Sequence, residues 1–149
     1  LNIAGEYFSD DYMNLNQLKK KFEDKISQNS KIKYLGKVFG TDKTKLLQSS
    51  DIFVLPSYKE AFPISIIEAM ASRNAVVVTK EKYISEVISS KNGVLVEKRS
   101  VQSLVDGIEF LINDKEKLKH IQNYNRLEAL EKFSMQKYLK KLEQIILNV

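Results

Sequence analysis

Short apolar runs alternate with stretches of helical periodicity along the chain, and this alternation restricts the possible folds more than any other feature. The apolar runs are Leu1–Gly5, Ile32–Leu35, Ile52–Leu55, Ala75–Thr79 and Val94–Val96. Short apolar strands that alternate with helices predict a parallel sheet covered by helices on both faces. We therefore expect an α/β, Rossmann-like domain with one parallel sheet of about five strands and a helical C-terminus.

Capping signals delimit the helices between these runs. The pattern predicts helices over about 14–26, 42–48, 63–72 and 84–89, and three more that begin after Ser100, Asp114 and Ser134. Thr41 or Asp42 can cap the second helix, because side chains of this kind accept hydrogen bonds from the first free backbone N–H groups. Pro63 suits the first position of its helix, where its missing N–H leaves no bond unmade.

Composition limits the chemistry that the chain can carry. The 149 residues are enough for a single domain with its own core, and they include no cysteine and one histidine, His120. Disulfides, thiolate chemistry and histidine-cluster metal sites are therefore not expected. The net charge of +5 is an excess of lysine, which fits an anionic ligand, an anionic membrane surface or an ordinary solvated surface. Aromatic residues do not interleave with the lysines, so nucleic acid is not an expected partner.

The segment EAFPISIIEAMAS places two glutamates, Glu60 and Glu68, around the start of an otherwise apolar helix. Ligands of parallel sheets bind at the carboxyl ends of the strands, and the loop that carries Glu60 leaves such an end. The free N–H groups at the start of the helix suit a diphosphate. Glu68 can reach back from the second turn to accept hydrogen bonds from a ribose diol, and Glu60 can meet hydroxyls of a second group. The alternatives are that the helix macrodipole alone favours Glu60 and that Glu68 faces solvent.

The longer run DIFVLPSYKEAFPISIIEAMASRNAVVVT resembles the nucleotide-sugar motif of GT-B retaining glycosyltransferases of glycosyltransferase family 4, also called group 1. The resemblance covers nearly the whole chain in order, and the matching residues are Pro56, Ser57, Glu60, Phe62, Glu68, Ala69, Met70, Ala71, Val76–Val78, Leu35-Gly36, Gly93–Val96 and Phe133-Ser134. It implies the C-terminal, donor-binding half of a GT-B fold. The full enzyme, a glycosyltransferase of the hexosyltransferase type, would transfer a sugar from a nucleoside diphosphate to an acceptor hydroxyl in glycan or polysaccharide biosynthesis.

The resemblance also implies roles for particular residues. Glu60 would be catalytic, beside the transferred sugar, and Glu68 would bind the ribose. The remaining donor-binding residues would be Ser57, the backbone around Ala61, Phe62, Pro63 and Ile64, and the loop with Lys37 and Val38 near the base. Neither a metal nor a cofactor is implied, since the nucleotide sugar is the donor substrate.

Some features depart from the family pattern. Lys82-Tyr83 occupies the place of a Gly-Gly turn, and Ala61 replaces a glycine. A strand with basic diphosphate contacts and an acceptor-binding domain would precede Leu1, so we expect a piece of a longer protein that is inactive alone. A non-catalytic GT-B-like interaction module and a sugar-nucleotide epimerase-like domain are the alternatives.

The expected partners and location follow from the same resemblance. They are a nucleotide sugar and, through the missing domain, an acceptor glycan or lipid-linked sugar. The expected location is cytoplasmic, with peripheral contact to the inner face of the membrane as an option. The base, sugar, linkage and acceptor are left open.

Overall fold

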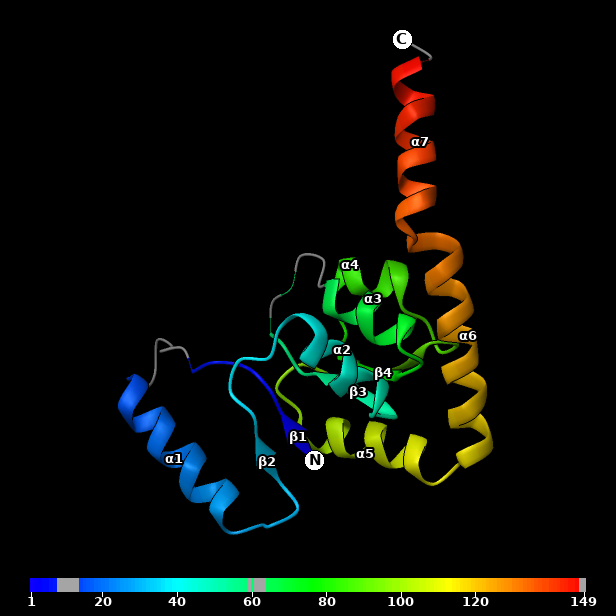
Figure 1. Ribbon diagram of the computed structural model, residues 1–149. Helices are drawn as coiled ribbons and strands as arrows, with labels where there is room; N and C mark the ends of the chain where they lie inside the picture. The colour runs from blue at the N-terminus through cyan, green and yellow to red at the C-terminus, as the bar shows by residue number, and fades with distance from the viewer. Residues whose placement is uncertain (8–13, 59, 61–63, 148–149) are drawn as a thin grey trace. The chain divides into compact units, whose positions relative to one another are not determined.

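A computed structural model describes residues 1–7, 14–58, 60 and 64–147, which fall into two compact units, 1–43 and 44–149 (Figure 1). The boundary between the units falls within α2 (Gly40–Gln48). Before it come β1 (Asn2–Ile3), α1 (Leu15–Ser27) and β2 (Lys33–Tyr34). After it come β3 (Ile52–Leu55), α3 (Ile64–Ala71), β4 (Ala75–Thr79), α4 (Lys82–Val87), β5 (Gly93–Val96), α5 (Val101–Ile112), α6 (Lys115–Phe133) and α7 (Met135–Leu147).

The first unit is built on a two-stranded parallel sheet of β1 and β2. Backbone pairing continues past the two strands, because the N–H of Gly5 donates to the carbonyl of Gly36 at 2.8 Å. The hydroxyl of Tyr34 donates to the carbonyl of Gly5, also at 2.8 Å. The rings of Tyr7, Phe22 and Tyr34 pack together with centroids 5.1–5.5 Å apart. This aromatic cluster joins α1 to the sheet of the first unit.

The second unit is built on a three-stranded parallel sheet with β4 between β3 and β5. All five residues of β4 are buried, and the first four, Ala75–Val78, alternate between two hydrophobic clusters. Val76 and Val78 pack with residues of α3 and α4, whereas Ala75 and Val77 pack with α5. Helices therefore cover both faces of this sheet, as Figure 1 shows. Helix α6 contributes Ala129 to the first of these clusters and Ile121 to the second, so it packs against both.

A buried network of asparagines fastens α6 to the amino ends of β4 and β5. Asn125 donates from Nδ2 to the carbonyls of Asn74, at 2.7 Å, and Asn92, at 2.8 Å, the residues that precede these strands. Asn92 donates in turn to Oδ1 of Asn125 at 2.9 Å. All three side chains are at most 1% exposed. Buried amides need partners. The side chains of Asn92 and Asn125 bond to each other and to the backbone, and Asn74 Nδ2 donates to the carbonyl of Leu47, whereas Asn74 Oδ1 is buried with no hydrogen-bond partner among the described residues.

Glu128 extends the network to the surface. Its carboxylate accepts hydrogen bonds from Lys132 Nζ at 2.6 Å, from the Tyr124 hydroxyl at 3.2 Å and from Asn92. Burial raises the pKa of the Glu128 carboxyl, but the bonds from Lys132 and Asn92, the Lys132 charge and Tyr124 outweigh it, so the pKa lies below its ordinary value of 4.5. The ionised form is therefore the one that the fold stabilises.

Glu128 should make stability fall in acid. Because its pKa is lower in the folded chain than in the unfolded one, its contribution is present above about pH 4.5 and is lost as the pH falls through the folded value. We expect urea unfolding to give a lower free energy of unfolding at pH 3 than at pH 7, and Glu128→Gln to be less stable at pH 7 and less sensitive to acid. The exposed Glu109 of α5 offers the control, since Glu109→Gln should leave the pH dependence unchanged. Equal pH slopes for the wild type and Glu128→Gln would contradict this assignment.

The structure confirms the α/β fold class, the parallel strands and the helical C-terminus that the sequence predicts. The structure differs from the predicted single sheet of about five strands, because its five strands lie in one sheet of two strands and one of three. Lys33 gives a reason: it interrupts the apolar run of β2 and is exposed, whereas a strand covered on both faces is apolar throughout. The prediction of a single domain stays a prediction.

Several predicted boundaries agree closely with the structure. The prediction for β4 is confirmed residue for residue, and Ser100 and Asp114 cap α5 and α6 by accepting from the N–H groups of Ser103 and Lys117. The helices α2 and α4 each begin two residues earlier than predicted, at Gly40 and Lys82. In the part of the chain that the structure describes, no helix is both long and apolar enough to cross a membrane.

Candidate functional site

Polar residues follow all three strands of the second unit at their carboxyl ends. Since β3, β4 and β5 are parallel, these ends share one edge of the sheet, here called the carboxyl edge. Along this edge lie Ser57, Tyr58 and Glu60 after β3, Lys80 and Glu81 after β4, and Glu97, Lys98, Arg99 and Ser100 after β5. This is the edge at which ligands of open parallel sheets bind.

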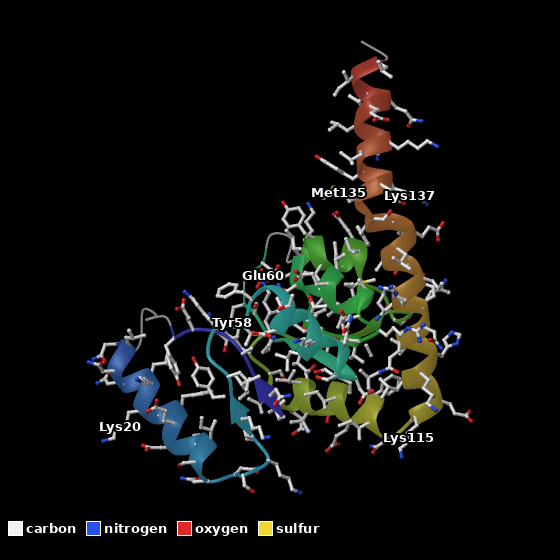
Figure 2. All side chains as sticks on the ribbon, in the orientation of Figure 1. Lys20, Tyr58, Glu60, Lys115, Met135 and Lys137 are labelled. Carbon is white, nitrogen blue, oxygen red and sulfur yellow. The ribbon has the colours of Figure 1, made fainter. Side chains whose placement is uncertain are left out.

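The two glutamates of the predicted site are placed by β3 and α3. Glu60 lies between these elements and is half-buried; Figure 2 labels it together with Tyr58. Glu68 is the fifth residue of α3, and it is half-buried with its Oε2 atom fully so. Helical side chains tilt toward the helix N-terminus, so Glu68 leans toward the start of α3, which follows the Glu60 segment. The two carboxylates therefore flank the beginning of one helix at the carboxyl edge.

The other predicted donor-binding residues divide into three groups. Ser57 is half-buried after β3, and Ile64, the first residue of α3, is 67% exposed. Ala61, Phe62 and Pro63 lie outside the described residues. Lys37 and Val38 belong to the first unit, so a site shared between them and the glutamates stays a prediction. The Lys37 ammonium forms an ion pair with the carboxylate of Glu6.

The structure brings together a set of residues at the carboxyl edge that the sequence analysis missed. Lys98 forms an ion pair with Glu81, and Lys80 lies 3.9 Å from Glu97. The guanidinium of Arg99 lies over the ring of Tyr58 with its carbon 5.6 Å from the ring centroid. Each contact joins loops that follow different strands. Only their position after strand ends could have drawn attention to these residues, because no periodicity or spacing predicts the pairing.

Lys82 and Tyr83, which stand where the resemblance leads us to expect a Gly-Gly turn, form the start of a helix. The two residues are the first of α4, and both are exposed. A glycine turn would let the backbone approach a ligand closely. Here two large side chains, Lys82 and Tyr83, stand at the start of a helix in place of a glycine turn.

An open groove of about 840 Å³ lies beside the start of α3. It is lined by Ile64 and Ile67 of α3 and by residues of α6 and α7, including Lys132, Phe133 and Tyr138. Of the predicted site residues that the structure describes, the groove shares Ile64 alone. We therefore place the candidate site at the carboxyl edge and not at the groove, because ligands of open parallel sheets bind at the carboxyl ends of the strands. Among the described residues, no three acidic, histidine or cysteine side chains are arranged to hold a metal ion.

A parallel sheet covered on both faces, with polar loops at its carboxyl edge, defines an α/β ligand-binding domain. The family model described as glycosyl transferases group 1 matches residues 1–128. The chain therefore belongs to the group 1 glycosyltransferase family, and the resemblance seen in the sequence is confirmed.

Curated relatives agree with this family. One is the N,N'-diacetylbacillosaminyl-diphospho-undecaprenol alpha-1,3-N-acetylgalactosaminyltransferase of Campylobacter jejuni, which is 36% identical over 122 residues, 79% of this chain and 32% of that protein. Another is the capsular polysaccharide biosynthesis glycosyltransferase CapM of Staphylococcus aureus, 30% identical over 70% of this chain and 28% of that protein. The chain spans about a third of the length of three curated relatives that it matches, 27–35% of each.

Solved structures share the fold. Anabaena Alr3699/HepE, in complex with UDP and glucose, superposes with a TM-score of 0.83 over 99% of this chain and 40% of that chain, at 20% identity. The C-terminal domain of the group 1 glycosyltransferase LpcC from Francisella tularensis gives 0.70 over 79% of this chain and 63% of that chain, at 30% identity. The likeness confirms the GT-B-type α/β fold that the resemblance implied.

Proposed function

We propose that this chain is the nucleotide-sugar-binding domain of a retaining glycosyltransferase that transfers a sugar from a nucleoside diphosphate to an acceptor hydroxyl in glycan or polysaccharide biosynthesis. The observation that carries the proposal is the placement of Glu60 and Glu68 on either side of the start of α3, at the carboxyl edge of a parallel sheet. The run that contains them also matches the family.

In this proposal a residue or backbone group of the chain binds each part of the nucleotide sugar. The free N–H groups at the start of α3 face the diphosphate, as helix N-termini commonly do with phosphates. The Glu68 carboxylate accepts hydrogen bonds from the ribose hydroxyls. Glu60 lies beside the sugar, where its negative charge stabilises the positive charge that develops on the ring in the transition state. Ser57, Ile64 and the segment 61–63 border the sugar and the diphosphate, and Lys37 and Val38 border the base.

Donor affinity tests the proposal most directly. Calorimetry on the full-length protein with UDP, GDP and ADP should show binding of at least one of them. Glu68→Ala should weaken that binding by about 10- to 100-fold, because charged hydrogen bonds contribute about 1.5–3 kcal/mol each. Glu109→Ala, a matched change on the exposed face of α5, should leave the affinity unchanged.

A non-catalytic module is the second candidate, and the helical start at Lys82 and Tyr83 favours it, because it removes the close backbone approach of the family's glycine turn. The same calorimetry separates the two functions. A full-length protein that binds none of the three nucleotides would support the module and contradict the glycosyltransferase.

We further propose that the acceptor, a glycan or a lipid-linked sugar, is bound by a separate domain of a longer protein, which acts in the cytoplasm or peripherally at the inner face of the membrane. The names of two relatives, from Campylobacter jejuni and Escherichia coli, specify diphospho-undecaprenol acceptors, and this supports a lipid-linked acceptor here. On this proposal the 149-residue chain alone transfers no sugar.

A further inference from the structure

One contact at the carboxyl edge links the Glu60 segment to a distant loop. The guanidinium carbon of Arg99 lies 5.6 Å from the centroid of the Tyr58 ring. A cation within about 6 Å of a ring centroid is attracted by the ring. Tyr58 follows β3 and stands two positions before Glu60, whereas Arg99 follows β5. Since β4 lies between these two strands, the contact spans the width of the sheet.

The backbone of Arg99 is held in an unusual conformation. Its φ is +57°, in the left-handed region that residues with a side chain rarely adopt. Among the residues that the structure describes, the other non-glycine residue with positive φ is Arg73, at +65°. Arg73 lies just past the end of α3, where this conformation is usual, and its N–H donates to the carbonyl of Met70. Arg99 follows a strand and not a helix, so helix termination does not explain its conformation.

The neighbours of Arg99 are anchored on both sides. Lys98 forms an ion pair with Glu81, which follows β4. Ser100 caps α5 by accepting a hydrogen bond from the N–H of Ser103 at 3.1 Å. The N–H of Glu97 donates to the hydroxyl of Ser103 at 3.0 Å. The turn that carries Arg99 is thus fixed to β4 and α5, and from this fixed turn the arginine reaches Tyr58.

We infer that Arg99 is a positioning residue that holds Tyr58 and, through it, Glu60, two positions further along the chain. The inference rests on the proposed function, in which Glu60 acts in turnover and Glu68 in donor binding. It implies that loss of the Tyr58–Arg99 contact lowers kcat and leaves KM for the donor unchanged, because the ribose and diphosphate contacts do not depend on it.

Steady-state kinetics of the full-length protein test this inference. Arg99→Asn removes the cation, and asparagine tolerates positive φ, so the turn should keep its shape. We expect kcat to fall about two- to fivefold, the factor that corresponds to one exposed cation–π contact. Tyr58→Leu should give the same loss, and Tyr58→Phe, which keeps the ring, should restore kcat. Arg73→Asn is the matched control, because it makes the same substitution at the other positive-φ arginine, and it should have no effect.

A double-mutant comparison of Arg99 and Tyr58 tests the inference more strictly than the single variants do. If Arg99 acts through Tyr58, the double variant Arg99→Asn/Tyr58→Leu should lose no more kcat than either single variant. Additive losses would overturn the inference, and so would a rise in KM at unchanged kcat, which would show that Arg99 touches the donor itself. An effect of Arg99→Asn no larger than that of Arg73→Asn would also overturn it.

A second readout separates failure of the inference from failure of the proposed function. If the full-length protein neither binds nucleotides nor transfers sugar, the proposed function fails, and NMR of the 149-residue chain then decides on the contact. The Tyr58 ring should shift the Arg99 side-chain protons upfield in the wild type and in Tyr58→Phe, but not in Tyr58→Leu. Relaxation of the Glu60 amide should show faster motion in Arg99→Asn than in Arg73→Asn. A wild type without the upfield shift, or equal Glu60 relaxation in both variants, would overturn the inference.

Discussion

Gly93→Ala is expected to destabilise the second unit by more than about 4 kcal/mol, a large part of the roughly 5–15 kcal/mol by which an ordinary domain is stable. Gly93 begins β5 and pairs with Val76 in the central strand. A Cβ atom at Gly93 would lie 1.8 Å from the carbonyl oxygen of Val76 and 2.7 Å from its carbonyl carbon. These are backbone atoms of a fully buried strand, so they cannot move aside as a flexible side chain could.

The displaced element would have to be β5 itself. Val96 of β5 packs with Val77 and with Leu111 of α5, so a shift of the strand opens that cluster as well as the ladder. Urea unfolding followed by circular dichroism measures the effect. Gly40→Ala is the control, because Gly40 has positive φ but a Cβ there would meet nothing within 4 Å. We expect the control to lose only about 1–2 kcal/mol, the cost of a left-handed backbone for alanine. A Gly93→Ala protein within about 1 kcal/mol of the wild type would contradict the steric argument.

The sequence predicts the parts of the fold that short-range patterns determine. The run AVVVT is apolar at its first four positions and ends in a β-branched threonine, as suits a strand covered on both faces, and β4 has these bounds. Ser100 and Asp114 are recognisable as caps because capping depends on neighbouring backbone groups. The early start of α4 at Lys82 is not predicted, since its N-cap residue, Glu81, makes no side-chain capping bond.

Contacts between distant segments are the part that the sequence does not predict. The buried trio Asn74, Asn92 and Asn125 comes from two loops and a helix, and each asparagine alone is typical of an exposed turn. The division of the strands into two sheets is also a tertiary result, although Lys33 marks β2 as exposed on one face.

The candidate site is partly predictable for a similar reason. The position of Glu60 after β3 follows from topology, because the carboxyl end of a parallel strand is where ligands bind. The choice of Glu60 and Glu68 as a pair depends on the family motif, and their roles stay predictions. The Tyr58–Arg99 contact depends on the register of three strands and on a strained turn, and no local pattern encodes either.

On the proposed function, Glu60→Gln is expected to lower kcat of the full-length protein by about 10²- to 10³-fold, the usual cost of removing one preorganised group that stabilises transition-state charge. Glutamine has nearly the same size and can still accept a hydrogen bond from a sugar hydroxyl. The negative charge is lost, and this charge matters most when the sugar ring becomes positive as the bond to the diphosphate breaks. The donor KM should therefore change little, because the ground-state sugar carries no such charge.

The opposite pattern is expected for Glu68→Ala, which should raise KM more than it lowers kcat, and the contrast between the two variants tests their separate roles. Glu97→Gln provides the matched control, because Glu97 is an exposed glutamate at the same carboxyl edge, 3.9 Å from Lys80. Its kcat and KM should stay near those of the wild type. If Glu60→Gln and Glu97→Gln have the same small effect on sugar transfer, Glu60 has no part in turnover. Its place at the start of α3 would then be explained by the preference of helix N-termini for acidic residues.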